Sequence, residues 1–135
     1  MDYRILLSSI KSEIFSIEDE HTYTHNPMTY AGAIDVNTYI KRDFAPLEER
    51  VKYVISTENA LPALFAAAKQ NLEDSLPKPF IETAIQITEG NAGFLKGDLI
   101  TALKDVKNDT LMTAFKKAND NAIKAYADFV QEMLR

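Results

Sequence analysis

Residues 111–133 read LMTAFKKANDNAIKAYADFVQEM, and this stretch decides the fold. Its apolar residues recur at intervals of 4, 3, 4, 3, 4 and 4, namely Leu111, Phe115, Ala118, Ala122, Ala125, Phe129 and Met133. That spacing places them on one face of an α-helix. Asn108 and Asp109 are suited to cap its start. A long helix, buried along one side against antiparallel neighbours, is therefore predicted to run nearly to the C-terminus.

The same helical period fills the middle of the chain, where proline and glycine mark the boundaries. Pro46 is predicted to begin one helix, and Pro62 either kinks that helix or starts another. Pro79 begins the next, which is predicted to stop at Gly97. Gly90, Gly93 and Gly97 share one side of that helix, where we expect the alanine-rich face of the last helix to approach closely. A hinge or a ligand contact is the alternative for these glycines.

The N-terminal segment predicts a helix from Asp2, as N-cap, to about Glu18. Its apolar face is formed by Tyr3, Leu6, Leu7, Ile10, Ile14 and Ile17. The threonine-rich segment 21–27 that follows ends in Asn26-Pro27 and is predicted to be a loop or a frayed helix end. A β-strand pattern is found nowhere. We predict an all-α, antiparallel bundle of about four to six helices in a single domain, 1–135.

Composition restricts the function. The chain has 135 residues, 46% of them hydrophobic and 26% charged, which is typical of a globular domain. It contains no cysteine, so disulfides, zinc–thiolate sites and cysteine nucleophiles are excluded. Its net charge of −5, with scattered basic residues, argues against a nucleic-acid partner. Neither a signal peptide nor an apolar stretch of membrane-spanning length is found, so no membrane association and a cytoplasmic location are expected.

His21 and His25 are the only histidines, and they are four residues apart. On a helix they would share a face with Glu18, which is a ligand set suited to zinc. The intervening threonines and tyrosine favour non-helical backbone instead. We therefore expect two loop histidines, no metal and no cofactor.

Three residues are candidates for ligand binding. Asn26 and Tyr30 flank a turn at Pro27, and loops between helices often line clefts. Arg42 precedes Asp43 and could clamp a substrate. The structural alternatives are that Asn26 caps the next segment, that Asp43 caps the helix at Pro46, and that Arg42 pairs nearby. No catalytic residue is predicted.

Several longer motifs point to a family. They are His25–Tyr30, Tyr39–Arg50, Leu61–Leu64, Ala67–Leu72, Pro79–Ala84, Gly90 with Phe94 and Leu95, and the helix face of Ala122, Ala125, Tyr126 and Phe129. The run Arg42–Leu47 is the most specific. From Ile14 onward the chain resembles the domain of unknown function 885 family.

The resemblance implies a mostly helical fold. Full-length members of that family are similar to zinc metallopeptidases with a His-Glu-x-x-His helix, and many are described as lipoproteins or hydrolases. They are several times longer and place that motif downstream of the region matched here. Since neither His21 nor His25 belongs to such a motif, the resemblance does not carry peptidase activity to this chain. It implies instead a helical segment of a larger fold, either truncated or a stand-alone remnant.

Two functions follow from different classes. The first is a non-catalytic structural or interaction domain that packs against a catalytic part or another chain. The second is an autonomous hydrolase, or a small-ligand-binding bundle, that uses the His21 and His25 region. For the first, the apolar stretches 63–68 and 81–87 predict an exposed interface and a homodimer. A monomer that covers both stretches is the alternative.

Overall fold

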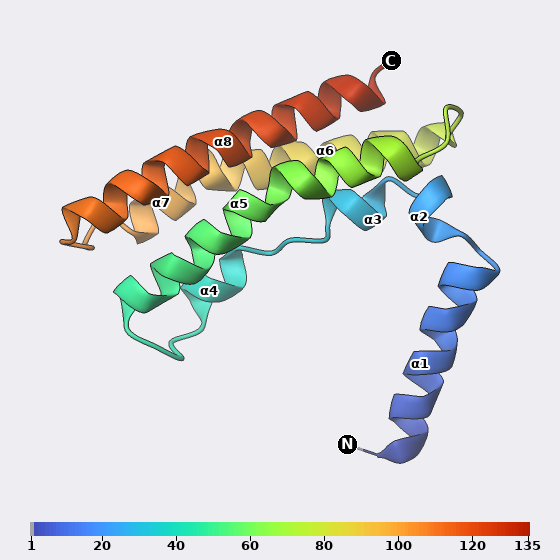
Figure 1. Ribbon diagram of the computed structural model, residues 1–135, viewed down its shortest axis with the longest axis horizontal. Coiled ribbons are helices and arrows are strands. Elements are labelled where there is room, and N and C mark those ends of the chain that lie inside the picture. The colour runs from blue at the N-terminus through green and yellow to red at the C-terminus, as the bar shows by residue number, and fades with distance from the viewer. Residues whose placement is uncertain (1) are drawn as a thin grey trace.

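The computed structural model describes residues 2–135, which form eight helices and no strand (Figure 1). The all-α prediction is confirmed. Four helices are long and four are short. They are α1 (Tyr3–Glu18), α2 (Thr22–His25), α3 (Met28–Ala31), α4 (Asn37–Lys41), α5 (Leu47–Asn71), α6 (Lys78–Lys96), α7 (Asp98–Ala102) and α8 (Asp109–Met133).

Helices α5, α6 and α8 build the bundle, and α8 packs along both of the others. Figure 1 shows α5 and α8 running in the same direction, with α6 antiparallel to both. Two side-chain contacts between α5 and α8 are consistent with this parallel course. Phe65 stacks on Phe129 with ring centroids 4.4 Å apart, and Lys69, one turn later, pairs with Glu132.

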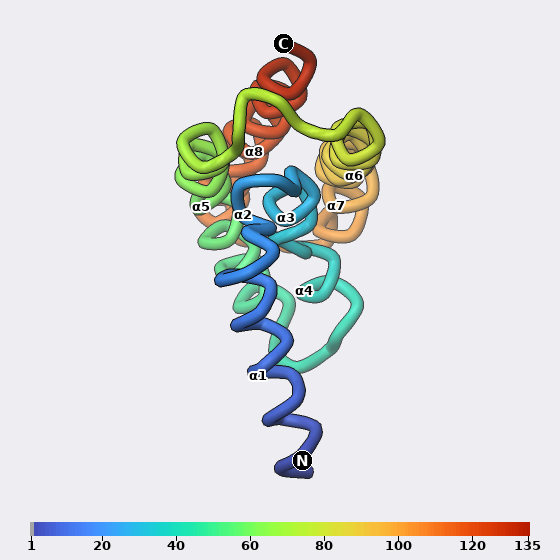
Figure 2. The backbone as a smooth tube through the Cα atoms, turned by 90° about the vertical axis from the view of Figure 1, so that its right-hand side faces the viewer, coloured from blue at the N-terminus to red at the C-terminus, as the bar shows by residue number. Residues whose placement is uncertain are grey.

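The short helices close the open side of this arrangement. Seen end-on in Figure 2, α5 and α6 stand apart, and α3 lies between them. Tyr30 and Ala31 of α3, with Val36 just before α4, are buried against the long helices. Segment 26–36 is therefore the floor of the bundle.

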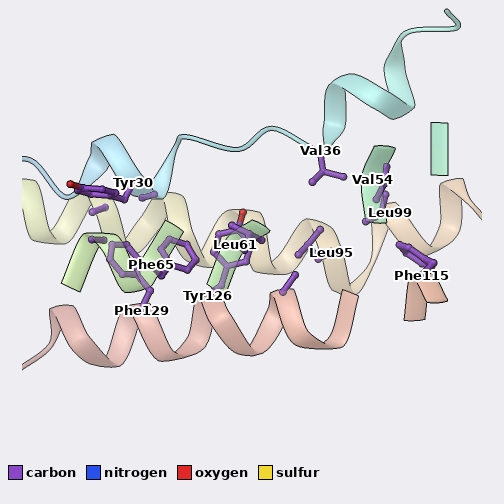
Figure 3. Close-up of a cluster of buried hydrophobic side chains, with 14 of the residues drawn as sticks. Tyr30, Val36, Val54, Leu61, Phe65, Leu95, Leu99, Phe115, Tyr126 and Phe129 are labelled. Carbon is purple, nitrogen blue, oxygen red and sulfur yellow. The ribbon is translucent and has the colours of Figure 1, made fainter. Parts of the chain in front are cut away.

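The α8 pattern is buried as predicted. Its fully buried members are Phe115, Ala118, Ala122, Phe129 and Met133, while Leu111 and Ala125 are half-buried. Figure 3 shows the rings of Phe65, Tyr126 and Phe129 gathered between the helices. The side chain of Asn108 caps the start of α8 by accepting the amide of Leu111 at 3.1 Å.

The predictions made at Pro62 and at the glycines of α6 are only partly confirmed. Helix α5 continues through Pro62, so this proline starts no new helix. The prediction of a close helix approach at Gly90 and Gly93 is wrong, because a Cβ at either position would meet nothing within 4 Å. Both glycines are exposed, and Gly93 borders a shallow groove between α6 and α8.

Helix α1 has the predicted bounds and the predicted cap, with the Asp2 side chain accepting the amide of Arg4 at 2.9 Å. It projects away from the bundle and packs only against α2 (Figures 1 and 2). None of the residues in α1 is buried. Its apolar face, which the sequence pattern assigns to an interior, is therefore left open.

The two stretches expected to form an exposed interface are mostly covered. In 63–68, Phe65 and Ala68 are buried and Leu64 is half-buried, because they point at α8 or the floor. In 81–87, Ile81, Ile85 and Ile87 are half-buried and pack against the core. An interface at these stretches stays a prediction, and the exposed large apolar side chains of the described residues gather mainly on α1.

Candidate functional site

The most unusual side chain of the bundle is Glu58 in α5. It is 0% exposed, and neither carboxyl oxygen has a hydrogen-bond partner among residues 2–135. Burial raises the pKa of this carboxyl from 4.5 to about 8. Removing a carboxylate from water without a partner is costly, so the group stays protonated at neutral pH.

Tyr126 of α8 lies close enough to Glu58 to be influenced by its charge. Burial first, then the Glu58 carboxylate, and to a smaller extent Asp35, raise the pKa of Tyr126 to about 12. A hydrogen bond with Asn91 of α6 acts in the opposite direction. The Asn91 amide also donates to the backbone oxygen of Ala31 in the floor, at 3.1 Å. The phenol of Tyr126 points from α8 toward that floor (Figure 3).

Asn119 of α8 is a second incompletely satisfied polar group. Its amide nitrogen donates to the backbone oxygen of Leu95 at 3.0 Å, which ties α8 to α6. Its side-chain oxygen, like those of Glu58, has no partner within residues 2–135. We name Glu58, Tyr126, Asn91 and Asn119 the polar core. Chemically it can hold one proton, on Glu58, out of contact with solvent.

The spacing of apolar residues in the sequence indicates that Glu58 is buried, although a charged residue is expected at the surface. Apart from Arg50, the buried positions of α5 are Val51, Val54, Glu58, Leu61, Phe65 and Ala68, spaced 3, 4, 3, 4 and 3 apart. Glu58 therefore sits in the middle of an apolar stripe, although glutamate is a residue type that is rarely buried. The spacing of the apolar stripe therefore predicts that Glu58 is buried, whereas its residue type predicts that it is exposed.

The predicted ligand residues Asn26 and Tyr30 both hold the floor together. The Asn26 side chain accepts the amide of Met28 at 3.0 Å, as the structural alternative expected. Tyr30 is buried, and its hydroxyl donates to the backbone oxygen of Tyr23 at 2.6 Å and accepts from the Asn71 amide at 3.2 Å. These contacts tie α2, α3 and α5 to one another.

Arg42 is exposed, and the arginine that organises this region is Arg50, which the sequence reasoning missed. The Arg50 guanidinium donates to four backbone oxygens, those of Tyr39, Ile40, Arg42 and Ala45. It also pairs with Asp43 at 3.2 Å. It thereby satisfies carbonyls that the short α4 leaves open at its end. Asp43 does not cap α5, whose first turn has no side-chain cap.

The two histidines lie at the two ends of α2, His21 directly before it and His25 as its last residue. Residues 22–25 form a short helix, so the prediction of a loop throughout 21–27 is wrong. His21 precedes it with a φ of 51°, the left-handed region, and is the single non-glycine residue of 2–135 with positive φ. His25 pairs through Nδ1 with Glu73 at 3.0 Å. The rings of His21 and His25 are 6.4 Å apart.

Residues 2–135 offer neither a metal-binding cluster nor a membrane-spanning helix. Between residues 2 and 135, no three histidine, aspartate or glutamate side chains group so as to hold a metal ion. Within the same residues, no helix has both the length and the apolarity to cross a membrane. A groove of about 530 Å³ lies between α5 and α8, with the apolar residues Pro62, Phe65, Ala125 and Phe129 and with polar residues such as Lys124 in its lining. Neither histidine borders it.

Comparison with known proteins gives one match. A family model described as "Bacterial protein of unknown function (DUF885)" matches residues 1–135. Neither a curated protein nor a solved structure matches the chain.

Proposed function

The chain belongs to the DUF885 family of bacterial proteins of unknown function, and we propose that it acts as a non-catalytic helical interaction domain. In this proposal the bundle of α5, α6 and α8 is a rigid support, and α1 is the element that binds a protein partner. The likeness to metallopeptidases, and the place of this single domain within a larger fold, stay predictions.

The open apolar face of α1 carries the proposal. Seven large apolar side chains of this helix are exposed, Tyr3 at 73% and Ile10 at 48% among them. The apolar face holds five of them, Tyr3, Leu6, Ile10, Ile14 and Ile17, whereas Ile5 and Phe15 are exposed on the side of Ser12. A contiguous apolar surface on a soluble protein usually marks a binding site for another protein or a membrane. The bundle gains no core contact from α1, so these side chains serve no purpose within the fold.

Of the polar side chains that the sequence offered as ligand contacts, Asn26 and Tyr30 support a structural role, whereas the Arg42 side chain does not. Asn26 caps the floor, and Tyr30 ties the floor to α5. In the α4–α5 loop, the backbone of Arg42 accepts from Arg50 while its side chain stays exposed. Groups whose hydrogen bonds are already used inside the fold are poorly placed to bind a substrate.

Site-specific photo-crosslinking in bacterial cells tests the proposal. A photoreactive residue replaces Ile10 on the apolar face, and in the matched control it replaces Ser12 on the opposite, serine-rich side of α1. We expect a discrete cross-linked protein product from position 10 and none from position 12. Products of equal yield from both positions, or no discrete product, would contradict binding through this face.

A further inference from the structure

The apolar residues of α1 follow the period of a coiled coil. Tyr3, Leu7, Ile10, Ile14 and Ile17 are spaced 4, 3, 4 and 3 apart, which is the alternation of a and d positions in a heptad. We name these five residues the α1 seam. Four of them are exposed and Leu7 is half-buried. A seam of this period fits a second helix with the same spacing better than it fits a flat surface.

The charges of α1 indicate what that second helix is. Arg4 and Lys11 lie in the first two thirds of the helix, whereas Glu13 and Glu18 lie toward its end, followed directly by Asp19 and Glu20. A parallel copy would place like charges side by side. An antiparallel copy places the basic part of each helix against the acidic part of the other, and it also opposes the two helix dipoles.

We propose that the partner of α1 is α1 of a second copy of this chain, paired antiparallel about a two-fold axis. This inference rests on the proposed function and names its partner. A two-fold arrangement uses the same face on both copies and closes the assembly at a dimer. It needs no movement of the bundle, because α1 already projects away from it (Figure 1).

The heptad allows registers seven residues apart, and the charges select the one that sets Arg4 against Glu18. Leu7 packs against Ile17 of the partner subunit, and Ile10 packs against Ile14 of the partner subunit, each twice by symmetry. Arg4 and Glu18 occupy equivalent positions beside the seam, so Arg4 of each copy meets Glu18 of the partner subunit. Ile5 and Phe15 lie outside the seam and stay open.

The same register limits the strength of the dimer. Lys11 and Glu13 lie near the two-fold axis, where each faces its own counterpart. The helix is 16 residues long and offers roughly 24 Å of seam. We therefore expect a reversible dimer that dissociates on dilution and responds strongly to single charge changes.

Sedimentation equilibrium of the full chain over a wide concentration range tests the inference. Dimerisation is expected for the native chain and is expected to be lost in Ile10→Ser. Arg4→Glu and Glu18→Arg are each expected to weaken the dimer by about tenfold, since two attractive contacts become repulsive. The double variant Arg4→Glu/Glu18→Arg restores opposite charges across the pair and is expected to recover native affinity.

Control measurements separate association from folding. Ser12→Glu, on the side of α1 away from the seam, is expected to dimerise like the native chain. The bundle of each variant is checked by its thermal transition, which we expect to stay unchanged because α1 contacts only α2.

The outcomes distinguish the two proposals. A monomer at all concentrations, or a dimer that survives Ile10→Ser, overturns pairing through the α1 seam. Single charge variants that weaken the dimer without rescue in the double variant overturn the antiparallel register. A cross-link from position 10 to a protein of another mass overturns self-pairing but leaves the interaction function standing, whereas a product of twice the chain mass supports both.

Discussion

Pro62 follows Glu58 by one helical turn in α5, so it offers no amide to the backbone oxygen of the residue whose side chain is fully buried. Helix α5 continues through this point. At the same residue, the backbone oxygen thus lacks its usual donor four residues on, and the carboxyl has no partner among residues 2–135. Packing of α6, α8 and the floor around Glu58 has to offset both costs.

We expect the stability of the chain to fall as pH rises from 4.5 to 8. Below pH 4.5 Glu58 is protonated both folded and unfolded, and it contributes no pH dependence. Between the two pKa values the unfolded chain releases the proton while the folded chain, with its pKa of about 8, retains it. Folding then costs progressively more, up to about 5 kcal/mol at pH 8 and above.

Urea unfolding of the native chain and of Glu58→Gln at pH 5 and pH 8 measures this effect. The variant is expected to be the more stable at pH 8 and to lose most of the difference at pH 5. The exposed Glu89→Gln is the matched control. Equal pH dependence in the native chain and Glu58→Gln would show that the Glu58 carboxyl ionises inside the fold without cost.

Substitution of Arg50 is expected to destabilise the chain far more than substitution of Arg42. Arg50→Met leaves four backbone oxygens without their donor and should cost about 2–4 kcal/mol. Arg42→Met removes only an exposed side chain and should change stability by less than about 0.5 kcal/mol. Chemical denaturation compares the two, and a larger loss in Arg42→Met would refute the assignment.

Loss of the Tyr30 hydroxyl is expected to loosen the floor of the bundle. Tyr30→Phe removes the bonds to Tyr23 and Asn71 and should cost about 1–2 kcal/mol. Tyr53→Phe, at an exposed tyrosine of α5, is the control and should be neutral. Amide hydrogen exchange is expected to accelerate in α2 and α3 before α8, and uniform acceleration would argue against a local role.

Gly93→Ala is expected to stabilise the chain by about 0.5–1 kcal/mol. Gly93 lies inside α6, and a Cβ at this position meets nothing within 4 Å. Alanine has the higher helix propensity, and no contact opposes it. Thermal denaturation should show a raised midpoint. A lowered midpoint would mean that a partner or ligand needs the bare backbone at this position.

The sequence predicted well where the helices lie along the chain, but poorly which side chains are covered by other parts of the fold. The bounds and cap of α1 and the buried face of α8 follow from local spacing and capping chemistry, which are readable along the chain. The exposure of Ile10 and Ile14 does not follow, because spacing tells which face is apolar and not what covers it. Glu58 and Arg50 were missed for the opposite reason. Each lies on or beside the stripe of α5, but residue type assigned them to solvent.

The hydrogen bonds made by the candidate ligand residues could not be predicted for a related reason. Asn26 and Tyr30 were singled out as turn residues near a possible cleft, and only the positions of Asn71 and Tyr23 show that Tyr30 is already fully engaged. That contact joins residues 41 positions apart. Such long-range pairing has no local signature in one sequence.

The parallel course of α5 and α8 has a consequence for how the chain folds. Two parallel helices cannot be joined by a short hairpin, so the segment 72–108 must first return along their whole length. The α6–α8 hairpin closes a shorter loop and has the lower entropic cost. We therefore expect α6 and α8 to associate early, with α5 docking last and burying Glu58 only in that final step, so that folding should slow as pH rises toward 8.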